Sequence, residues 1–290
     1  MNRRRLFARS FRLGVVAATT ALILPLLAAP VGARAADPAK KEIVFGATAG
    51  PYADQIRYGI APILEKQGYR VRVVEFNDYI QPNYALAEGS LDANAFQHEV
   101  YLQRFASDKK LAITELVKVP TAPIAIYSHK HSLADVKDGA TVALPNDPTN
   151  QARALVVLDR KLGWLKLKEG YDPIRVSERD VVANPKHLKL VTLEAAQLPR
   201  SLDDTDYSFI NGNFAIASGM KITDALALED TTPTYQNVVA VRTADRDLPF
   251  VKDIEAAYKS REFLDVTNKR FPGFVKTAYQ LQLERLRADR

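Results

Sequence analysis

The fold of this chain is decided by residues 42–76, which read EIVFGATAGPYADQIRYGIAPILEKQGYRVRVVEF. The apolar run at residues 42–47 predicts a buried strand. Apolar side chains then recur at helical spacing over residues 53–67, and the glycine that follows ends this helix. The β-branched, alternating run at residues 69–76 predicts a second strand. Strand, helix and strand in this order predict a βαβ unit with parallel strands.

The same alternation continues along the chain and restarts near residue 122. Further strands are predicted at residues 91–97, 122–128, 141–144, 188–193, 207–210 and 238–242, and helices at residues 84–88, 101–106, 150–162, 195–202, 251–258, 261–271 and 275–290. We therefore expect an α/β fold of two lobes, each a mostly parallel sheet flanked by helices. The expected division is 36–121 for the first part of lobe 1, 122–236 for lobe 2, and 237–290 for the return to lobe 1 and the C-terminal helix.

The first 35 residues have the three parts of a secretory signal. The chain begins with the basic run Arg3-Arg4-Arg5, has no charge over residues 13–29, and then reads Ala33-Arg34-Ala35, which is a cleavage pattern. The uncharged run is short for a membrane span and contains Pro25, so a cleaved signal is favoured over an uncleaved anchor. We expect a periplasmic protein, with membrane association as the alternative if the signal stays in place.

The signal segment also carries all of the chain's net charge. The whole sequence has 40 basic and 34 acidic residues, and residues 1–35 hold six arginines and no acid, which leaves 34 of each sign afterwards. A nucleic-acid binder needs clustered excess positive charge, so nucleic acid is not an expected partner. The sequence has no cysteine, which excludes disulfides and a lipid-modified cysteine.

Polar and aromatic side chains follow the predicted strands of the first lobe, where α/β sheets place their ligands. Tyr79 comes soon after the strand at residues 69–76, and Phe96, His98 and Tyr101 gather at the end of the next strand. Aromatic rings beside polar groups suit a ligand with an apolar tail and a polar handle. Ordinary core aromatics with a satisfied histidine are the alternative.

The second lobe offers polar groups in the same kind of position. After the strand at residues 141–144, Thr149 or Asn150 can cap a helix whose free N–H groups attract an anion. Arg153 then lies in the first turn and can form a fork with a carboxylate; a plain cap with a solvated arginine is the alternative. Asn211 and Asn213 can bind the amine and carboxylate of a zwitterion, or can form an ordinary turn.

Signals for catalysis are poor. No H-E-x-x-H pair, G-x-S-x-G elbow or phosphate-binding glycine loop occurs. We therefore expect no catalytic residue, no cofactor and no metal site. Two alternatives are a metal site in the polar turn at His129 and His131, and an exported enzyme that uses His98 as an acid or base.

Four blocks of the sequence resemble the methionine-binding lipoprotein family of the NlpA type. They read DYIQPN at 78–83, LDANAFQH at 91–98, PNDPTN at 145–150 and LEAAQLPR at 193–200. The resemblance runs from about residue 42 to about residue 274. It implies a type II periplasmic-binding fold that closes on a free amino acid, usually L-methionine. The implied partners are the membrane permease and the ATPase of an ABC importer; another amino acid or a small peptide is the alternative ligand.

The resemblance also implies which residues bind the ligand. On the first lobe's side of the pocket it assigns Tyr79, Phe96, His98 and Tyr101, whose rings would hold a thioether. It also assigns Arg153 to the ligand carboxylate, Asn211 and Asn237 to its amino and carboxylate groups, and Asn150 and Asn213 as further candidates. The chain departs from the family in having no lipobox cysteine and in having Tyr52 where many members have histidine.

Overall fold

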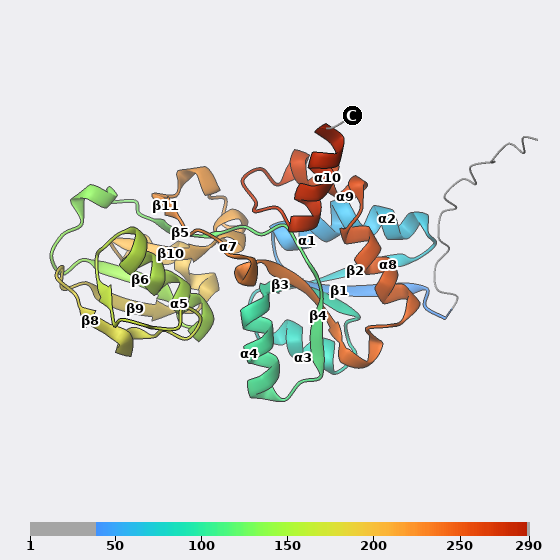
Figure 1. Ribbon diagram of the computed structural model, residues 1–290, viewed down its shortest axis with the longest axis horizontal. Helices are drawn as coiled ribbons and strands as arrows, with labels where there is room; N and C mark the ends of the chain where they lie inside the picture. Colours follow the sequence, from blue (N-terminus) through green and yellow to red (C-terminus); the bar gives the residue numbers. More distant parts are fainter. Residues whose placement is uncertain (1–38, 289–290) are drawn as a thin grey trace, which may run out of the picture. The chain divides into compact units, whose positions relative to one another are not determined.

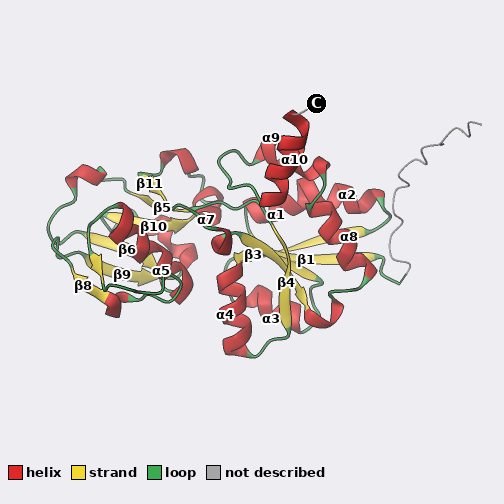
Figure 2. Cartoon of the chain, in the orientation of Figure 1, coloured by secondary structure: helices red, strands yellow, loops and turns green. Residues whose placement is uncertain are grey.

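The computed structural model describes residues 39–288, and these residues form one compact unit. The signal segment expected at residues 1–35 lies outside the described residues. The described chain forms two five-stranded sheets and one two-stranded sheet, with helices around them (Figures 1 and 2). The predicted α/β class is therefore confirmed. No helix in residues 39–288 is both long enough and apolar enough to cross a bilayer.

The first sheet is built around the segment that decides the fold. Its strands in spatial order are β2 (Arg70–Phe76), β1 (Glu42–Thr48), β3 (Ala93–His98), β12 (Asn237–Arg242) and β4 (Ile113–Lys118). β1 pairs in parallel with β2 and with β3, as the βαβ pattern predicts. β12 runs antiparallel to both of its neighbours, β3 and β4.

Both faces of the first sheet are covered by helices, which explains why the central residues 43–47 of β1 carry no polar side chain. Ile43 and Phe45 point to the face covered by α1 (Pro51–Gln55), α2 (Ala61–Lys66) and α8 (Pro249–Tyr258). Val44 points to the other face, where it packs with Leu86 of α3 (Gln81–Ala87) and Leu102 of α4 (Glu99–Lys109). A π-helical turn at Ile56–Ile60 joins α1 to α2, so the predicted helix continues from Pro51 to Lys66.

The second sheet follows the same plan. Its strands in spatial order are β11 (Ala227–Leu228), β5 (Ile124–Tyr127), β10 (Tyr207–Asn211), β6 (Thr141–Pro145) and β9 (Lys189–Leu193). One face packs on α5 (Pro148–Val156) through Leu155, and the other on α6 (Leu198–Ser201) and α7 (Gly212–Ala217) through Leu198 and Phe214. The small third sheet pairs β7 (Lys166–Leu167) with β8 (Val181–Ala183).

The expectation that each sheet would be mostly parallel is wrong, because half of the strand pairings in each five-stranded sheet are antiparallel. β5 and β12 are the strands by which the chain enters one sheet from the other, through residues 119–123 and 229–236. A strand that arrives in this way has no crossover helix on the same sheet to make it parallel to its neighbours. In the second sheet, β5 accordingly runs antiparallel to β10 and β11.

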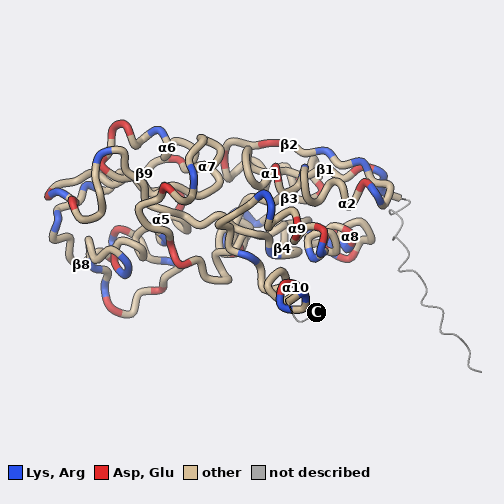
Figure 3. Tube along the Cα trace, turned by 90° about the horizontal axis from the view of Figure 1, so that it is seen from above, with Lys and Arg blue, Asp and Glu red and all other residues tan. Residues whose placement is uncertain are grey.

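Several elements were not predicted, among them the strands β4, β7, β8 and β11 and the helix α7, and one helix begins later than expected. β4 carries Glu115 and Lys118 and lies at a sheet edge, so it lacks the continuous apolar pattern of a buried strand. α7 begins at Gly212, where a turn was the alternative. After α9 (Arg261–Arg270), the terminal helix α10 (Ala278–Ala288) begins three residues later than expected, because Val275 pairs with Thr121. Basic and acidic residues are interspersed along the trace in Figure 3.

Candidate functional site

One small pocket, whose empty space of about 300 Å³ is partly open to solvent, is lined by side chains from elements of both five-stranded sheets, and we refer to it as the inner cavity. Every residue that was assigned to ligand binding from the sequence lines it, namely Tyr79, Phe96, His98, Tyr101, Asn150, Arg153, Asn211, Asn213 and Asn237. Tyr52, Gln97 and Ala122 complete the lining. The chain therefore brings together residues that lie as far apart in sequence as Tyr52 and Asn237.

Aromatic rings form the apolar side of the inner cavity. The ring of Tyr79 lies 5.8 Å from that of Phe96 and 6.0 Å from that of Tyr101, measured between ring centroids. Stacked and edge-on pairs at these distances are favourable beyond the area they bury. The hydroxyl of Tyr79 donates to Oδ1 of Asn213 at 2.8 Å. Burial raises the pKa of Tyr79 well above its ordinary value, so this hydroxyl keeps its proton.

His98 is a buried histidine with both ring nitrogens engaged. It caps α4, where Nδ1 accepts from the backbone N–H of Tyr101 at 3.0 Å. The ring proton must therefore be on Nε2, which lies 3.3 Å from Oδ1 of Asn150. Burial, and then the positive charge of Arg153, lowers the pKa of His98 well below its ordinary value. The imidazole is neutral and serves as a hydrogen-bond donor to Asn150.

The start of α5 differs from the expectation in a way that shapes the site. Asp147, and not Thr149 or Asn150, caps the helix by accepting the backbone N–H of Asn150 at 2.9 Å. The carboxylate of Asp147 thus takes the place in which an external anion was expected to bind. Because α5 begins at Pro148, Asn150 and Arg153 are three residues apart within the helix and share one face.

The side-chain oxygen of Asn150 accepts hydrogen bonds from three neighbouring side chains. It accepts from Nη1 of Arg153 at 2.7 Å and from Nδ2 of Asn211 at 3.0 Å, in addition to Nε2 of His98. Its own amide donates to Asp147 at 2.9 Å. Asn150 therefore orients the groups around it, and its oxygen has little capacity left to bind a ligand directly.

Arg153 forms a buried ion pair with Glu229, which was not predicted from the sequence. Nε of Arg153 donates to Oε2 of Glu229 at 2.9 Å, and Nη2 donates to Oε1. Burial by itself lowers the pKa of Arg153, but the charge and hydrogen bonds of Glu229 outweigh this effect and raise it. With Asn150 on Nη1, two of the five guanidinium N–H groups have no partner in residues 39–288.

No signal in the sequence pointed to Glu229. It is one acid among the polar residues that follow β11, with no partner at helical or strand spacing. Only the fold brings its carboxylate to Arg153, where it also accepts the backbone N–H of Ile124 at 3.1 Å and the hydroxyl of Thr231 at 3.0 Å. Since both charges are buried, removing either partner alone would leave the other charge buried and uncompensated, which is costly.

The other asparagines of the inner cavity, Asn211, Asn213 and Asn237, differ in which of their side-chain atoms have hydrogen-bond partners. Asn213 donates to the hydroxyl of Thr48 at 3.3 Å, and Asn237 donates to the backbone oxygen of Phe96 at 2.8 Å. Oδ1 of Asn211 is buried and has no hydrogen-bond partner among residues 39–288. A buried acceptor without a partner is costly, so this oxygen marks a position where a donor from a ligand is favoured.

Tyr52 belongs to the site although the sequence marked it only as a departure from the family pattern. Its side chain is almost fully buried and lines the inner cavity. The hydroxyl accepts the backbone N–H of Ala122 at 3.3 Å. Burial raises the pKa of Tyr52 far above its ordinary value, so the hydroxyl keeps a proton that it can donate.

The histidines considered as a metal site lie elsewhere. His129 contacts Asp203 at 3.6 Å, and His131 contacts Asp206 at 3.2 Å. Among residues 39–288, no three His, Cys, Asp or Glu side chains are grouped so as to hold a metal ion.

Acid is expected to destabilise the protein through His98. The folded state holds this imidazole neutral, because its pKa is lowered, whereas the unfolded chain takes up a proton at about pH 6.5. The unfolded state therefore binds more protons below that pH, and the free energy of unfolding falls by up to about 1.4 kcal/mol per pH unit. Denaturation at pH 7.5 and pH 5.5 should show this loss in the wild type and not in His98→Gln.

His129→Gln is the matched control, since this histidine is exposed, and it should keep the wild-type pH dependence. If His98→Gln and the wild type lost the same free energy between the two pH values, His98 would not be the group responsible.

Comparison with known proteins places the chain among bacterial binding proteins. The model of the NlpA lipoprotein family matches residues 43–279. The chain is 40% identical to the D-methionine-binding lipoprotein MetQ of Salmonella typhi over 268 residues, which is 91% of this chain and 97% of that protein. A nutrient-binding protein from Burkholderia cenocepacia, solved bound to methionine, is 42% identical with a TM-score of 0.76, and the match covers 81% of this chain and 99% of that one.

A periplasmic substrate-binding protein of an ABC transporter from Coxiella burnetii is also similar. It is 39% identical with a TM-score of 0.76, and the match covers 81% of this chain and all of that one. These structures confirm the periplasmic-binding fold that the sequence resemblance implied.

Proposed function

Because this chain belongs to the NlpA lipoprotein family, we propose that it is the substrate-binding component of an ABC importer and that its ligand is L-methionine. The similar proteins described as methionine-bound and as part of an ABC transporter support this role. The proposed binding site is the inner cavity, between a lobe of residues 36–121 and 237–290 and a lobe of residues 122–236. The partners would be the importer's permease and ATPase.

The polar side of the inner cavity is the observation that carries the proposal. Arg153 has two N–H groups free for a carboxylate, and Oδ1 of Asn211 is a buried acceptor free for an ammonium group. Asn150 joins these two side chains by hydrogen bonds to both, so their spacing is fixed. A free amino acid presents a carboxylate and an ammonium group on one carbon, which matches this pair of partners.

Charge balance and the aromatic rings narrow the ligand class further. Glu229 neutralises Arg153 and His98 is neutral, so the buried groups favour a ligand without net charge, as a zwitterion is. The rings of Tyr79, Phe96 and Tyr101 would hold the side chain of the ligand. A thioether is favourable there, because sulfur gains about 0.3–1.5 kcal/mol from an aromatic contact.

The proposed role is binding and not catalysis. Both ring nitrogens of His98 already have hydrogen-bond partners within the protein, which leaves neither free to transfer a proton to a substrate. The relatives are named as binding proteins. A small peptide would need room beyond the small inner cavity, so a single amino acid is favoured over it.

We propose that the protein acts outside the cytoplasm, exported by the signal expected at residues 1–35. Its relatives are named as lipoproteins, which are exported. The present sequence has no cysteine to carry a lipid. We therefore expect the protein in the periplasmic extract and not in the membrane pellet.

One experiment tests ligand and location together. The protein is recovered from the periplasmic extract, any retained ligand is identified by mass spectrometry, and the ligand is removed by unfolding and refolding. Calorimetry is then performed with L-methionine, D-methionine and L-leucine. We expect micromolar or tighter binding of L-methionine and weaker binding of L-leucine, whose side chain lacks the sulfur. No binding of L-methionine at micromolar concentration would reject the ligand, and preference for D-methionine would reverse the proposed enantiomer.

A further inference from the structure

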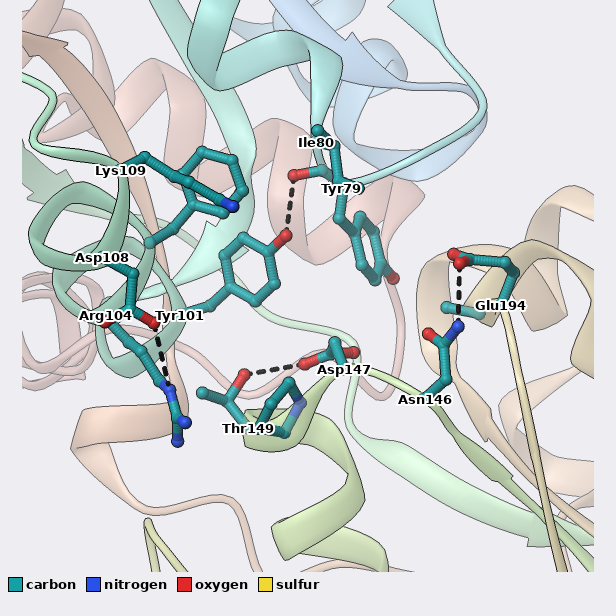
Figure 4. Close-up of a pocket in the computed structure, with 13 residues that line it drawn as sticks. Tyr79, Ile80, Tyr101, Arg104, Asp108, Lys109, Asn146, Asp147, Thr149 and Glu194 are labelled. Carbon is teal, nitrogen blue, oxygen red and sulfur yellow. Dashed lines mark hydrogen bonds and ion pairs between the residues drawn. The ribbon is translucent and has the colours of Figure 1, made fainter.

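A second pocket adjoins the inner cavity and shares two tyrosines with it. This outer pocket has a volume of about 830 Å³, part of which is open to solvent, and is lined by α4, residues 79–80, residues 146–149 and residues 194–195 (Figure 4). Tyr79 and Tyr101 line both spaces. Their two side chains therefore form the wall that separates the inner cavity from the outer pocket.

The wall is held in place by specific contacts. The hydroxyl of Tyr101 donates to the backbone oxygen of Tyr79 at 2.9 Å, as Figure 4 shows, and the hydroxyl of Tyr79 bonds to Asn213. The ring of Tyr101 also stacks on that of Phe105, with centroids 5.7 Å apart and planes at 17°. Tyr101 is only 8% exposed. A ring fixed in this way resists displacement by a longer ligand.

The outer pocket is suited to an apolar group. Tyr79, Tyr101, Phe105 and Ile80 supply ring faces and an aliphatic side chain, and Ile80 is 45% exposed. Several charged groups that line it are already paired within the protein. Arg104 contacts Asp108 at 3.6 Å, Glu194 accepts from Asn146 at 2.7 Å, and Asp147 accepts from Thr149 at 2.9 Å. Lys109 also lines the pocket, so the attractions that the pocket offers are aromatic contact and the positive charge of this lysine.

From this arrangement we propose that the ring of Tyr101 limits the length of the ligand's side chain. In the absence of this ring, an apolar group attached to the ligand's sulfur atom would extend into the outer pocket. The inference rests on the proposed function, because it requires the head group at Arg153 and the tail at the aromatic rings. With the head group fixed, a side chain longer than the inner cavity meets the Tyr101 ring. If the ring is removed, the inner cavity and the outer pocket become one space, and the protein then binds S-substituted homocysteines.

The test compares three ligands with graded sulfur substituents, which are L-methionine, its S-ethyl analogue and S-benzyl-L-homocysteine. Calorimetry is performed on the wild type, Tyr101→Ala and Tyr101→Leu. We expect the wild type to bind the S-benzyl ligand at least about tenfold more weakly than methionine, since one methylene too many costs about 10–200-fold in a fitted pocket. In both variants this ratio should fall by about tenfold or more.

Ile80→Ala is the matched control. It enlarges the outer pocket from a side that does not face the inner cavity, so the wild-type order of the three ligands should persist. Tyr101→Leu keeps a helix-forming apolar residue and carries the test if Tyr101→Ala does not fold.

The outcomes separate the two proposals. No methionine binding by the wild type would refute the proposed function. Methionine binding together with an unchanged ligand ratio in folded Tyr101 variants would overturn the length limit alone. Equal loss of all three ligands in both variants would also overturn it, because Tyr101 would then be a general contact. Tight S-benzyl binding by the wild type would show that the ring is no barrier.

Discussion

Replacing Arg153 by alanine is expected to remove the carboxylate partner of the ligand and to lower the affinity for methionine by about 2–5 kcal/mol. This corresponds to a loss of about 30-fold to several thousand-fold in the dissociation constant. Arg153 is only 4% exposed, so water cannot readily take the place of its guanidinium as a partner for the ligand. Calorimetry with L-methionine measures the change, and an unchanged affinity would refute the role assigned to Arg153.

The same substitution is expected to lower the free energy of unfolding by about 3–5 kcal/mol, because it leaves the carboxylate of Glu229 buried without its positive partner. Urea denaturation measures this loss. The double variant Arg153→Met with Glu229→Gln removes both charges and keeps a side-chain oxygen for the backbone N–H of Ile124. It should regain most of the lost stability and remain unable to bind methionine tightly. Continued instability of the double variant would show that the ion pair is not the cause.

Replacing Gly212 by alanine is expected to damage the site through the backbone. A Cβ at this position would lie 2.5 Å from Cβ of Ala122 and 2.6 Å from the backbone oxygen of Pro123, both in the segment that joins the two sheets. Because one of these atoms belongs to the backbone, the start of α7 must move. Overpacking of this kind costs about 1–3 kcal/mol of stability.

The shift would also displace Asn211 and Asn213, which flank Gly212 and line the inner cavity. Losing one hydrogen bond between Asn211 and a charged ammonium group costs about 1.5–3 kcal/mol, or about tenfold to 150-fold in affinity. Gly59→Ala is the matched control, since its Cβ would lie 2.5 Å from the ring of Phe263, away from the inner cavity. It should lower the melting temperature and leave methionine affinity unchanged. Equal affinity in both variants would contradict the prediction for Gly212.

Much of the fold could be predicted because it is encoded locally. The apolar run of β1 and the helical spacing after it can be read from consecutive residues. A short apolar run of this length is typical of a strand that is buried on both faces of a sheet. The antiparallel course of β5 and β12 could not be predicted in the same way. The direction of a strand depends on the side from which the chain enters the sheet. That side is set by the course of the chain between the two sheets and not by the residues of the strand itself.

The sequence by itself determined the α/β class, the family and nine of the twelve residues that line the inner cavity, because strand ends and family blocks are readable from consecutive residues. Only the tertiary structure decided how these residues are paired. Glu229 meets Arg153 across 76 positions of sequence, and Tyr79 and Tyr101 become a wall only when α4 is packed beside the loop after β2. Hydrogen bonds and ion pairs of this kind depend on distances of a few ångströms, and the folded chain sets those distances.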